Sequence, residues 1–309
     1  MLKFEAYAEA INQALENWPS LQGAGQCFQP QEIIDSANGV DPPQPLRAAM
    51  RYSLLLGGKR IRSVLLLMAY HMLKENWEDV LPYACAVEMI HTYSLIHDDL
   101  PALDNDSMRR GKPSNHVVFG ENMAILAGDG LLNMAYETML NALFTQEHPT
   151  DSLRAIREIA HRAGVCGMIA GQTLDVALEG TQPYEAAVRY IHQHKTADLV
   201  TAPVLAGLML AGANEEQLQA GETFGRCLGL CFQIVDDLLD VQGNEQEVGK
   251  TLHKDAVCGK QTWPTIFGIE ESRKQAQLLS DEACMAVSRF GASAEGFIDM
   301  AKRLVRRNK

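Results

Sequence analysis

Apolar residues recur at intervals of three and four along most of the chain. The clearest stretches cover residues 62–73, 84–97, 124–143 and 215–240. This spacing predicts α-helices, and no convincing run of alternating apolar and polar residues predicts strands. Several stretches are apolar on more than one face, which is typical of helices buried inside a large bundle. We therefore predict one all-α domain over residues 1–309, in which residues 19–45 form an N-terminal connection without a clear pattern.

Composition excludes several classes of protein. With 27 Lys and Arg against 39 Asp and Glu, the chain has a net charge of −12, whereas a nucleic-acid binder needs a basic face. The longest nearly apolar stretch, 199–213, contains Pro203 and is shorter than the roughly 20 residues of a membrane span. The N-terminal residues carry acids where a secretory signal is apolar, and the seven cysteines form no CxxC pair. We expect a cytoplasmic protein with no nucleic-acid partner and no membrane span.

An acidic cluster lies where the helix over 84–97 is predicted to end. Asp98 and Asp99 follow that helix, and Pro101 disfavours helical backbone at the residue before it. Asp104 lies six residues after Asp98. Carboxylates in a last helical turn oppose the helix dipole, at a cost of ~0.3–1 kcal/mol each when exposed, unless a cation binds there.

A second cluster repeats this conflict before Gly243, a natural helix stop. It consists of Asp236, Asp237 and Asp240, and the first and last of these share a helix face. One cluster alone is as well explained by a solvated helix end, but two clusters within apolar helices favour a metal site. Because Mg²⁺ is usually held by a few carboxylates together with substrate phosphates, two such sets across a cavity would suit a magnesium–diphosphate cluster.

Two groups of cations complement the acids. In the first, Lys59 and Arg62 follow two glycines at the start of an apolar helix, where backbone N–H groups and cations together bind phosphate. The second group is Arg109, Arg110 and Lys112. Solvated loop charge is the alternative for either group alone. Together with the acids, they imply two anionic substrates, one bound through metal and the other directly by Lys and Arg.

These motifs resemble those of the short-chain trans-prenyltransferases (polyprenyl diphosphate synthases), and within that family the bacterial farnesyl diphosphate synthases. The matching stretches are GGKRIR (57–62), EMIHTYSLIHDDLPALDNDSMRRGKP (88–113), GQTLD (171–175), HKTADLV (194–200), FQIVDDLLD (232–240) and GKTLHKDAVCGKQTWP (249–264). The resemblance implies an isoprenoid-synthase-type helical bundle around a deep central cavity, a homodimer, and Mg²⁺ as the cofactor, with three ions per active site.

By resemblance, the motif residues take specific roles. The magnesium ligands would be Asp98, Asp99, Asp104, Asp236, Asp237 and Asp240. The direct ligands of the allylic diphosphate would be Arg109, Lys195, Lys250 and Lys260. The isopentenyl diphosphate site would consist of Gly58, Lys59, Arg62, His91 and Arg110. The remaining histidines near the motifs match no such position: His97, His192 and His194.

The implied reaction is the ionisation of an allylic diphosphate (dimethylallyl or geranyl), condensation with isopentenyl diphosphate, and elimination of a proton. Metal ions and cations make diphosphate a better leaving group, and an apolar pocket keeps water from the allylic cation. We expect the departing diphosphate to take the proton, because the motifs contain no apparent protein base. Lys195, Thr196 and Gln233 match catalytic residues, and Gln233 also matches a substrate contact.

The product length depends on Tyr93, with Ser94 beside it. Tyr93 lies five residues before Asp98, about 7.5 Å along a helix axis, where its ring would floor the cavity. An aromatic residue here, with the two-residue insertion in the first acidic motif, is similar to the farnesyl-forming arrangement, although an ordinary core tyrosine is the alternative. Farnesyl diphosphate is therefore the expected product, with geranylgeranyl diphosphate as the alternative.

Two other classes remain as alternatives. A terpene cyclase shares the fold and an acidic motif, but it has no use for GGKRIR. A non-catalytic partner subunit would be expected to lose metal ligands, and both acidic sets are intact. Four residues depart from the family's usual pattern without removing a proposed ligand: Ser63 for proline, Ser107 for an acid, His253 for glycine and Trp263 for tyrosine. Among these, His253 is expected to affect how the loop after the second acidic motif closes.

Overall fold

The computed structural model describes residues 2–22, 41–144, 148–182, 184–242, 260 and 262–307. Within these residues the chain is almost entirely helical, and its one sheet is a short hairpin of β1 (Met108–Arg109) and β2 (Lys112–Pro113). The predicted all-α class is thus confirmed. Of the predicted connection 19–45, the structure describes the 3₁₀ turn η1 (Pro19–Leu21) and the residues from 41 onward.

Contacts group the helices into two compact units. The N-terminal unit comprises Leu2–Val64 and Leu81–Thr145, and the C-terminal unit comprises Leu65–Val80 and Gln146–Lys309. The helices of the N-terminal unit are α1 (Leu2–Glu16), α3 (Gln44–Leu54), the start of α4 (Ile61–His71), α5 (Leu81–Asp98), α6 (Asn115–Phe119) and α7 (Glu121–Leu143).

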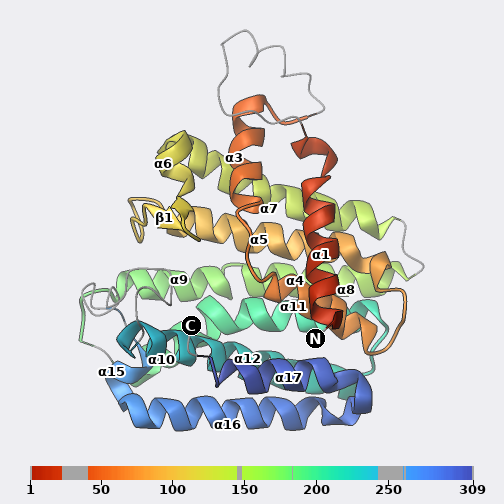
Figure 1. Ribbon diagram of the computed structural model, residues 1–309, viewed down its shortest axis with the longest axis vertical. Helices are drawn as coiled ribbons and strands as arrows, with labels where there is room; N and C mark the ends of the chain where they lie inside the picture. Colours follow the sequence, from red (N-terminus) through yellow and green to blue (C-terminus); the bar gives the residue numbers. More distant parts are fainter. Residues whose placement is uncertain are drawn as a thin grey trace. The chain divides into compact units, whose positions relative to one another are not determined.

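Helix α5 is the core of the N-terminal unit. It packs along α7, and α3 and α1 also contact it (Figure 1). Most of its residues are buried on every side of the helix, among them Tyr83, Met89 and Ile90. This explains why the sequence there is apolar on more than one face.

One buried ion pair fixes the start of α4 to α5. The guanidinium of Arg60 donates to Glu88 at 2.8 Å, and the two residues are only 3% and 1% exposed. The second carboxylate oxygen of Glu88 accepts from the Ser63 hydroxyl at 2.8 Å, while Arg60 also donates to Asn12. A buried charge is tolerated when it is paired and hydrogen-bonded in this way. The departure from proline at Ser63 therefore has a structural partner.

Helix α12 is the core of the C-terminal unit. The elements of this unit beyond α4 are η2 (Trp77–Val80), α8 (Pro149–Ala163), α9 (Met168–Ala177), α10 (Glu185–Ile191), the π-helix η3 (His192–Ala197), α11 (Asp198–Leu210), α12 (Glu215–Gln242), α15 (Trp263–Phe267), α16 (Ile269–Val287), η4 (Ser288–Ala294) and α17 (Glu295–Leu304). Helix α12 packs against α16 and α11 (Figure 1). Glycine allows the close approach to α11, because a Cβ at Gly225 would lie 2.6 Å from the Cα of Thr201.

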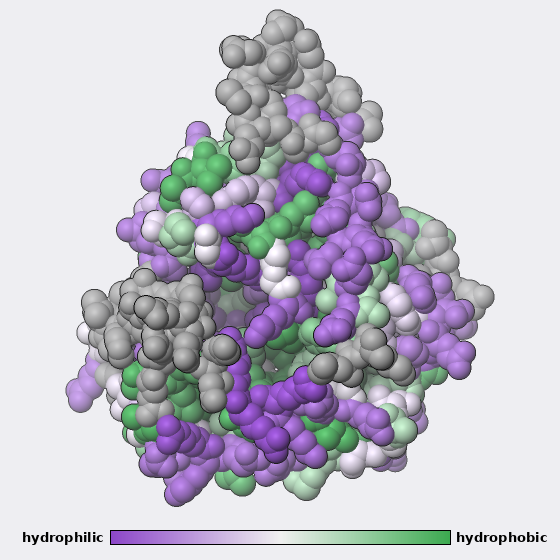
Figure 2. Space-filling view, viewed as in Figure 1, coloured by the Kyte–Doolittle hydropathy of each residue, from purple (hydrophilic) through white to green (hydrophobic). Residues whose placement is uncertain are grey.

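Helix α17 covers part of the unit's surface. Phe297 on its inner face is buried and meets Phe224 of α12 edge to face at 4.8 Å. Its outer face is mainly hydrophilic (Figure 2). Among the described residues, no helix is both long enough and apolar enough to cross a bilayer.

Candidate active site

The GGKRIR segment forms a left-handed turn before α4. Gly57, Gly58 and Arg60 all have positive φ, at 86°, 128° and 51°. A Cβ at Gly58 would lie 2.6 Å from the guanidinium of Arg110, and that guanidinium donates to the Gly57 carbonyl. The φ of 128° favours glycine at position 58, and the missing side chain leaves room for the Arg110 guanidinium. The turn brings together two basic groups that lie about fifty residues apart in the sequence, with Lys59 exposed beside them.

His91 and Arg62 also meet in the N-terminal unit. Arg62 Nη1 lies 3.5 Å from His91 Nε2. Burial, and then the neighbouring charge of Arg62, lowers the pKa of His91 well below its usual range. A neutral imidazole is thus favoured beside the arginines. Four of the five residues predicted for the isopentenyl diphosphate site therefore form two contacting pairs.

The first acidic motif folds back on the end of α5. The backbone N–H of Asp104 donates to the carbonyl of Asp98 at 2.9 Å, and the N–H of Asp106 donates to the carbonyl of Asp99 at 3.2 Å. Asn105 takes a left-handed conformation with φ of 49°, which lets the loop reverse. The turn satisfies helix-end carbonyls and returns Asp104 to the neighbourhood of Asp98. Both of these aspartates are partly exposed.

Asp99 is buried and paired with Arg109. Both of its oxygens accept from Arg109 Nε, at 3.0 and 3.2 Å, and a second guanidinium nitrogen contacts it as well. Burial alone would lower the pKa of Arg109, but the hydrogen bond that it donates to Asp99, together with the negative charges of Asp99, Asp98 and Asp104, raises this pKa overall. A predicted metal ligand and a predicted diphosphate ligand thus neutralise each other in this chain.

Tyr93 is buried one and a half helical turns before the first motif. Its ring meets His97 edge to face at 5.8 Å. Burial, and then the nearby Tyr136 of α7, raises the pKa of Tyr93 to about 12, so the phenol stays neutral. Ser94 donates its hydroxyl to the carbonyl of His91 and lies on a partly exposed face. This position fits the predicted role of Tyr93, in which its bulky ring limits the length of the growing product.

In the C-terminal unit, the HKT motif lies in η3. π-helical turns are rare and often occur at functional sites. Thr196 Oγ1 donates to Gln233 Oε1 at 2.6 Å, and Gln233 Nε2 donates to Asp237 at 2.8 Å. These bonds join η3 to the second acidic motif on α12.

The GQTLD and HKT motifs, each of which is weak evidence for the family when taken singly, contact one another. Lys195 Nζ donates to Asp175 at 2.6 Å. A Cβ at Gly171 would lie 2.1 Å from the backbone nitrogen of Lys195, so only glycine allows α9 to lie this close to η3. Lys195, a predicted diphosphate ligand, is thus held by a carboxylate from the other motif. Lys260 is partly buried, whereas Lys250 and His253 lie outside the described residues.

The second acidic motif has one partly exposed aspartate and two buried ones. The side chain of Asp236 is 30% exposed, and Arg307 lies 3.9 Å from it. Asp237 is 3% exposed and Asp240 is 5% exposed. The three aspartates predicted as equivalent ligands thus occupy different surroundings.

The residues fit magnesium in their chemistry. Among the described residues no three His, Cys, Asp or Glu side chains converge on one point. Mg²⁺ usually takes one or two carboxylates and completes its shell with water and substrate phosphates. Asp98 and Asp104 on one unit, and Asp236 on the other, offer partly exposed oxygen donors of this kind.

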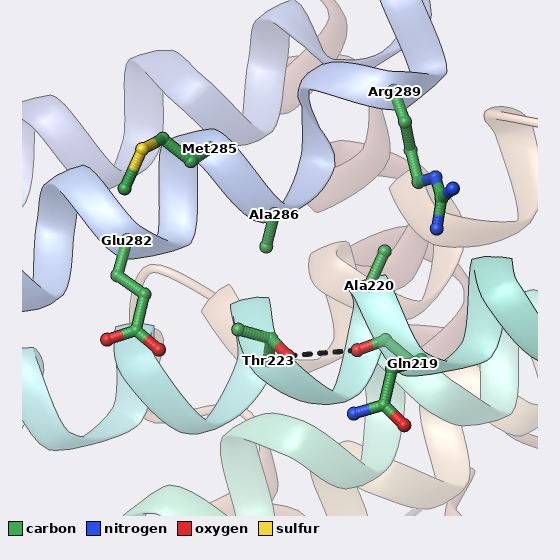
Figure 3. A pocket seen from close by; sticks show the side chains of 7 residues that line it. All are labelled: Gln219, Ala220, Thr223, Glu282, Met285, Ala286 and Arg289. Atoms are coloured by element: carbon green, nitrogen blue, oxygen red, sulfur yellow. Dashed lines mark hydrogen bonds between the residues drawn. The ribbon is translucent and has the colours of Figure 1, made fainter.

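A shallow groove lies between α12 and α16, away from every motif. Its volume is about 490 Å³, and its walls include Thr223, Glu282, Met285 and Arg289 (Figure 3). Arg226 and Glu282 form an ion pair beside it at 3.2 Å. The groove holds none of the acids or cations of the motifs, so we assign the chemistry to the motif residues.

Sequence reasoning missed three residues that hold the motifs in place. Glu88 pairs with Arg60, Asp175 pairs with Lys195, and His192 lies 3.2 Å from Asp237. The acids could have been suspected, because Glu88 lies in an apolar stretch and Asp175 ends a matching motif. His192 had no such signal, since a lone histidine on a helix is more often a core residue.

Comparison with known proteins agrees with the motifs. The family model for polyprenyl synthetase matches residues 43–288. The chain belongs to the polyprenyl synthetase family. A geranylgeranyl diphosphate synthase of Cyanophora paradoxa is 43% identical over 287 residues, covering 91% of this chain and 95% of the relative.

Solved structures agree over nearly the whole chain. An FPP/GFPP synthase from Zymomonas mobilis has a TM-score of 0.82 and 30% identity, covering 98% of this chain and 99% of that one. A geranyltransferase from Helicobacter pylori complexed with magnesium and isoprenyl diphosphate has a TM-score of 0.80 and 31% identity, covering 98% and 95%. The isoprenoid-synthase type of all-α fold is thereby confirmed.

Proposed function

We propose that this chain is a magnesium-dependent trans-prenyltransferase that joins an allylic diphosphate to isopentenyl diphosphate. The observation that carries the proposal is the basic turn, where Gly58 admits Arg110 and Arg62 meets His91. An enzyme that only ionised an allylic diphosphate would not need this second anion site. The relatives' names and the neighbour complexed with magnesium and isoprenyl diphosphate support the same activity.

The residues divide the reaction between them. When bound, magnesium supplies the positive charge that makes diphosphate a leaving group. Its expected ligands are Asp98 and Asp104 in the N-terminal unit and, separately, Asp236 in the C-terminal unit. Each unit also has a cation that can turn toward diphosphate oxygens: Arg109, now paired with Asp99, and Lys195, now paired with Asp175.

Thr196 and Gln233 present oxygen atoms whose dipoles stabilise an allylic cation. The neutral His91 and the arginines of the basic turn hold the second diphosphate. Its alkene attacks C1 of the allylic cation and forms the new carbon–carbon bond. Loss of a proton to the departed diphosphate restores the double bond.

Two products are candidates, and a specific observation favours each. The names of several relatives at 43–45% identity favour geranylgeranyl diphosphate, with twenty carbons. The buried ring of Tyr93 below the first acidic motif favours farnesyl diphosphate, with fifteen carbons.

The test uses labelled isopentenyl diphosphate with dimethylallyl, geranyl or farnesyl diphosphate, and chromatography of the dephosphorylated products. If farnesyl diphosphate is elongated as readily as geranyl diphosphate, the twenty-carbon product is correct; if it accumulates unused, the fifteen-carbon product is correct. A cyclic hydrocarbon formed without isopentenyl diphosphate would instead show a terpene cyclase.

We also propose a homodimer through α6 and α7. These helices expose a row of apolar side chains that other parts of the N-terminal unit leave uncovered: Val117, Val118, Ile125, Leu126 and Leu140. Burial of such a patch favours association of two copies. Sedimentation velocity of the wild type and of a double variant, Ile125→Asp with Leu126→Asp, tests this. A dimer that becomes a monomer supports the proposal, and a wild-type monomer contradicts it.

A further inference from the structure

Asp237 is held at both of its carboxylate oxygens. One oxygen accepts from Gln233 Nε2 at 2.8 Å. The other accepts from the backbone N–H of Trp263 at 2.8 Å and lies 3.2 Å from His192 Nε2. With 3% of its surface exposed, the carboxylate faces protein donors on every described side.

The residues that hold Asp237 form a compact group. The rings of His192 and Trp263 stack at 5.6 Å with an angle of 27° between their planes, and both residues are buried. The guanidinium of Arg189 lies 5.0 Å from the centre of the Trp263 ring on its open side. His192 is the first residue of η3, and Trp263 is the first residue of α15. Three segments far apart in the sequence thus converge on one carboxylate.

The carboxylate determines the direction of a hydrogen-bond chain. An ionised aspartate can only accept, so Gln233 must turn its NH₂ toward Asp237 and its carbonyl oxygen toward Thr196. Thr196 must then donate its proton to Gln233, as its 2.6 Å bond indicates. The lone pairs of the Thr196 hydroxyl are left to point elsewhere. This is the orientation in which the hydroxyl oxygen can stabilise a cation.

We propose that Asp237 is a positioning residue and not a metal ligand, and that it forms with His192 and Trp263 a buried latch that fixes the polarity of the Gln233–Thr196 pair. The proposal rests on the proposed function, because it assigns the latch to the step in which the allylic cation forms. Protein groups already occupy three of the roughly four acceptor positions of the Asp237 carboxylate, and the residue is only 3% exposed. The side chain of Asp236, the adjacent aspartate, is 30% exposed, with Arg307 3.9 Å away.

The first experiment compares Asp237→Asn with Asp236→Asn. Magnesium-dependent binding of inorganic diphosphate is measured by calorimetry, and kcat is measured with both substrates. In Asp237→Asn the new amide turns its NH₂ toward Gln233, which then flips and presents a donor to Thr196. We expect kcat to fall by about 10–100-fold while the magnesium concentration for half-maximal diphosphate binding changes less than about twofold.

Asp236→Asn should instead raise that magnesium concentration by about tenfold or more, in addition to its loss of activity. Equal shifts of the magnesium dependence in the two variants would overturn the proposal, because Asp237 would then act as a metal ligand.

The second experiment compares His192→Gln with His192→Leu. Glutamine keeps an N–H donor within reach of Asp237, whereas leucine keeps only bulk. We expect His192→Gln to retain kcat within about threefold and His192→Leu to lose about tenfold or more, with KM values for both substrates unchanged. Equal kcat losses in the two variants, with equal melting temperatures, would overturn the role of His192.

Trp263 provides a readout that is independent of turnover. In a Trp18→Phe, Trp77→Phe background, the emission of Trp263 reports the polarity around its ring, which changes if the backbone N–H of Trp263 leaves Asp237. Both variants lose the stacked imidazole, but His192→Gln keeps a donor to Asp237, so its emission maximum should lie closer to that of the wild type than the maximum of His192→Leu does. If the wild type forms no prenyl product but these spectra behave as expected, the proposed function fails and the latch remains. If the wild type is active but the spectra of the two variants agree, the latch fails alone.

Discussion

In the N-terminal unit the second aspartate of the acidic motif, Asp99, is paired with the guanidinium of Arg109, whereas in the C-terminal unit its counterpart Asp237 is held by a backbone N–H, an amide and a histidine ring. Both are buried, at 2% and 3% exposure, and in both motifs the first aspartate is partly exposed. In both motifs the Asp-Asp pair therefore places its first aspartate toward solvent and its second aspartate inside the protein. The difference lies in the partner, because a guanidinium can turn to an incoming diphosphate while a backbone N–H cannot.

The largest expected effect comes from the exposed first aspartates. Asp98→Asn and Asp236→Asn should each lower kcat/KM by about a thousandfold, because each removes a charged ligand of a cation that activates the leaving group. Initial rates at rising magnesium concentrations test this. Glu137→Gln, on the exposed face of α7, is the matched control and should retain full activity. Wild-type rates in Asp98→Asn would show that the N-terminal motif holds no metal.

The pairing of Asp99 with Arg109 predicts a smaller effect. Arg109→Gln should raise KM for the allylic diphosphate by about 10–100-fold, because it removes a charge-assisted contact. Arg110→Gln, the adjacent arginine at the basic turn, should instead raise KM for isopentenyl diphosphate. Both constants come from the same two-substrate kinetics. If both variants raise the same KM, the two arginines do not serve separate sites.

Tyr93 distinguishes the N-terminal unit further, because it places a buried ring behind the first motif. Tyr93→Ala should lengthen the product, with the total rate changed by less than about tenfold. Chromatography of the products provides the measurement, and Tyr93→Phe keeps the ring and should keep the wild-type product. An unchanged product length in Tyr93→Ala would remove Tyr93 from this role.

The smallest effect concerns His91 and pH. The pKa of His91 in the folded chain lies below its ordinary value of 6.5. The unfolded chain therefore binds more protons as the pH falls below about 6.5, and acid lowers the free energy of unfolding. His91→Asn removes this contribution. Urea unfolding near pH 7 and near pH 5 should show a smaller acid-induced loss of stability in the variant, and an equal loss would contradict a depressed pKa.

Much of the fold follows from local pattern. The apolar spacing predicted the helices now seen as α5, α7 and α12, and Pro101 marked the end of α5 near Asp98. The π-helical turn at His192–Ala197 was not predicted, and its contacts with Gly171 and Asp175 come from another helix, α9, whose position the local pattern does not give. The grouping of the helices into two compact units depends on which helices share a core and not on how any one of them is patterned.

The sequence identified candidate residues for the site, but it did not indicate which of them contact one another. Nothing in the sequence indicates that the guanidinium of Arg110 lies against Gly58. The acidic motifs suggested six equivalent ligands, and the structure separates partly exposed donors from buried, partnered ones. The ring of His192 stacks on Trp263, which lies seventy-one residues later in the chain. Partners this distant leave no periodic signal in the sequence.

The most direct test of the account is the ratio of diphosphate released to isopentenyl diphosphate consumed, measured with dimethylallyl diphosphate and magnesium. The account predicts one diphosphate for each isopentenyl diphosphate, with no release when isopentenyl diphosphate is omitted and none from Asp98→Asn above the uncatalysed rate. Diphosphate release that continues without isopentenyl diphosphate, or wild-type protein that releases none, would contradict it.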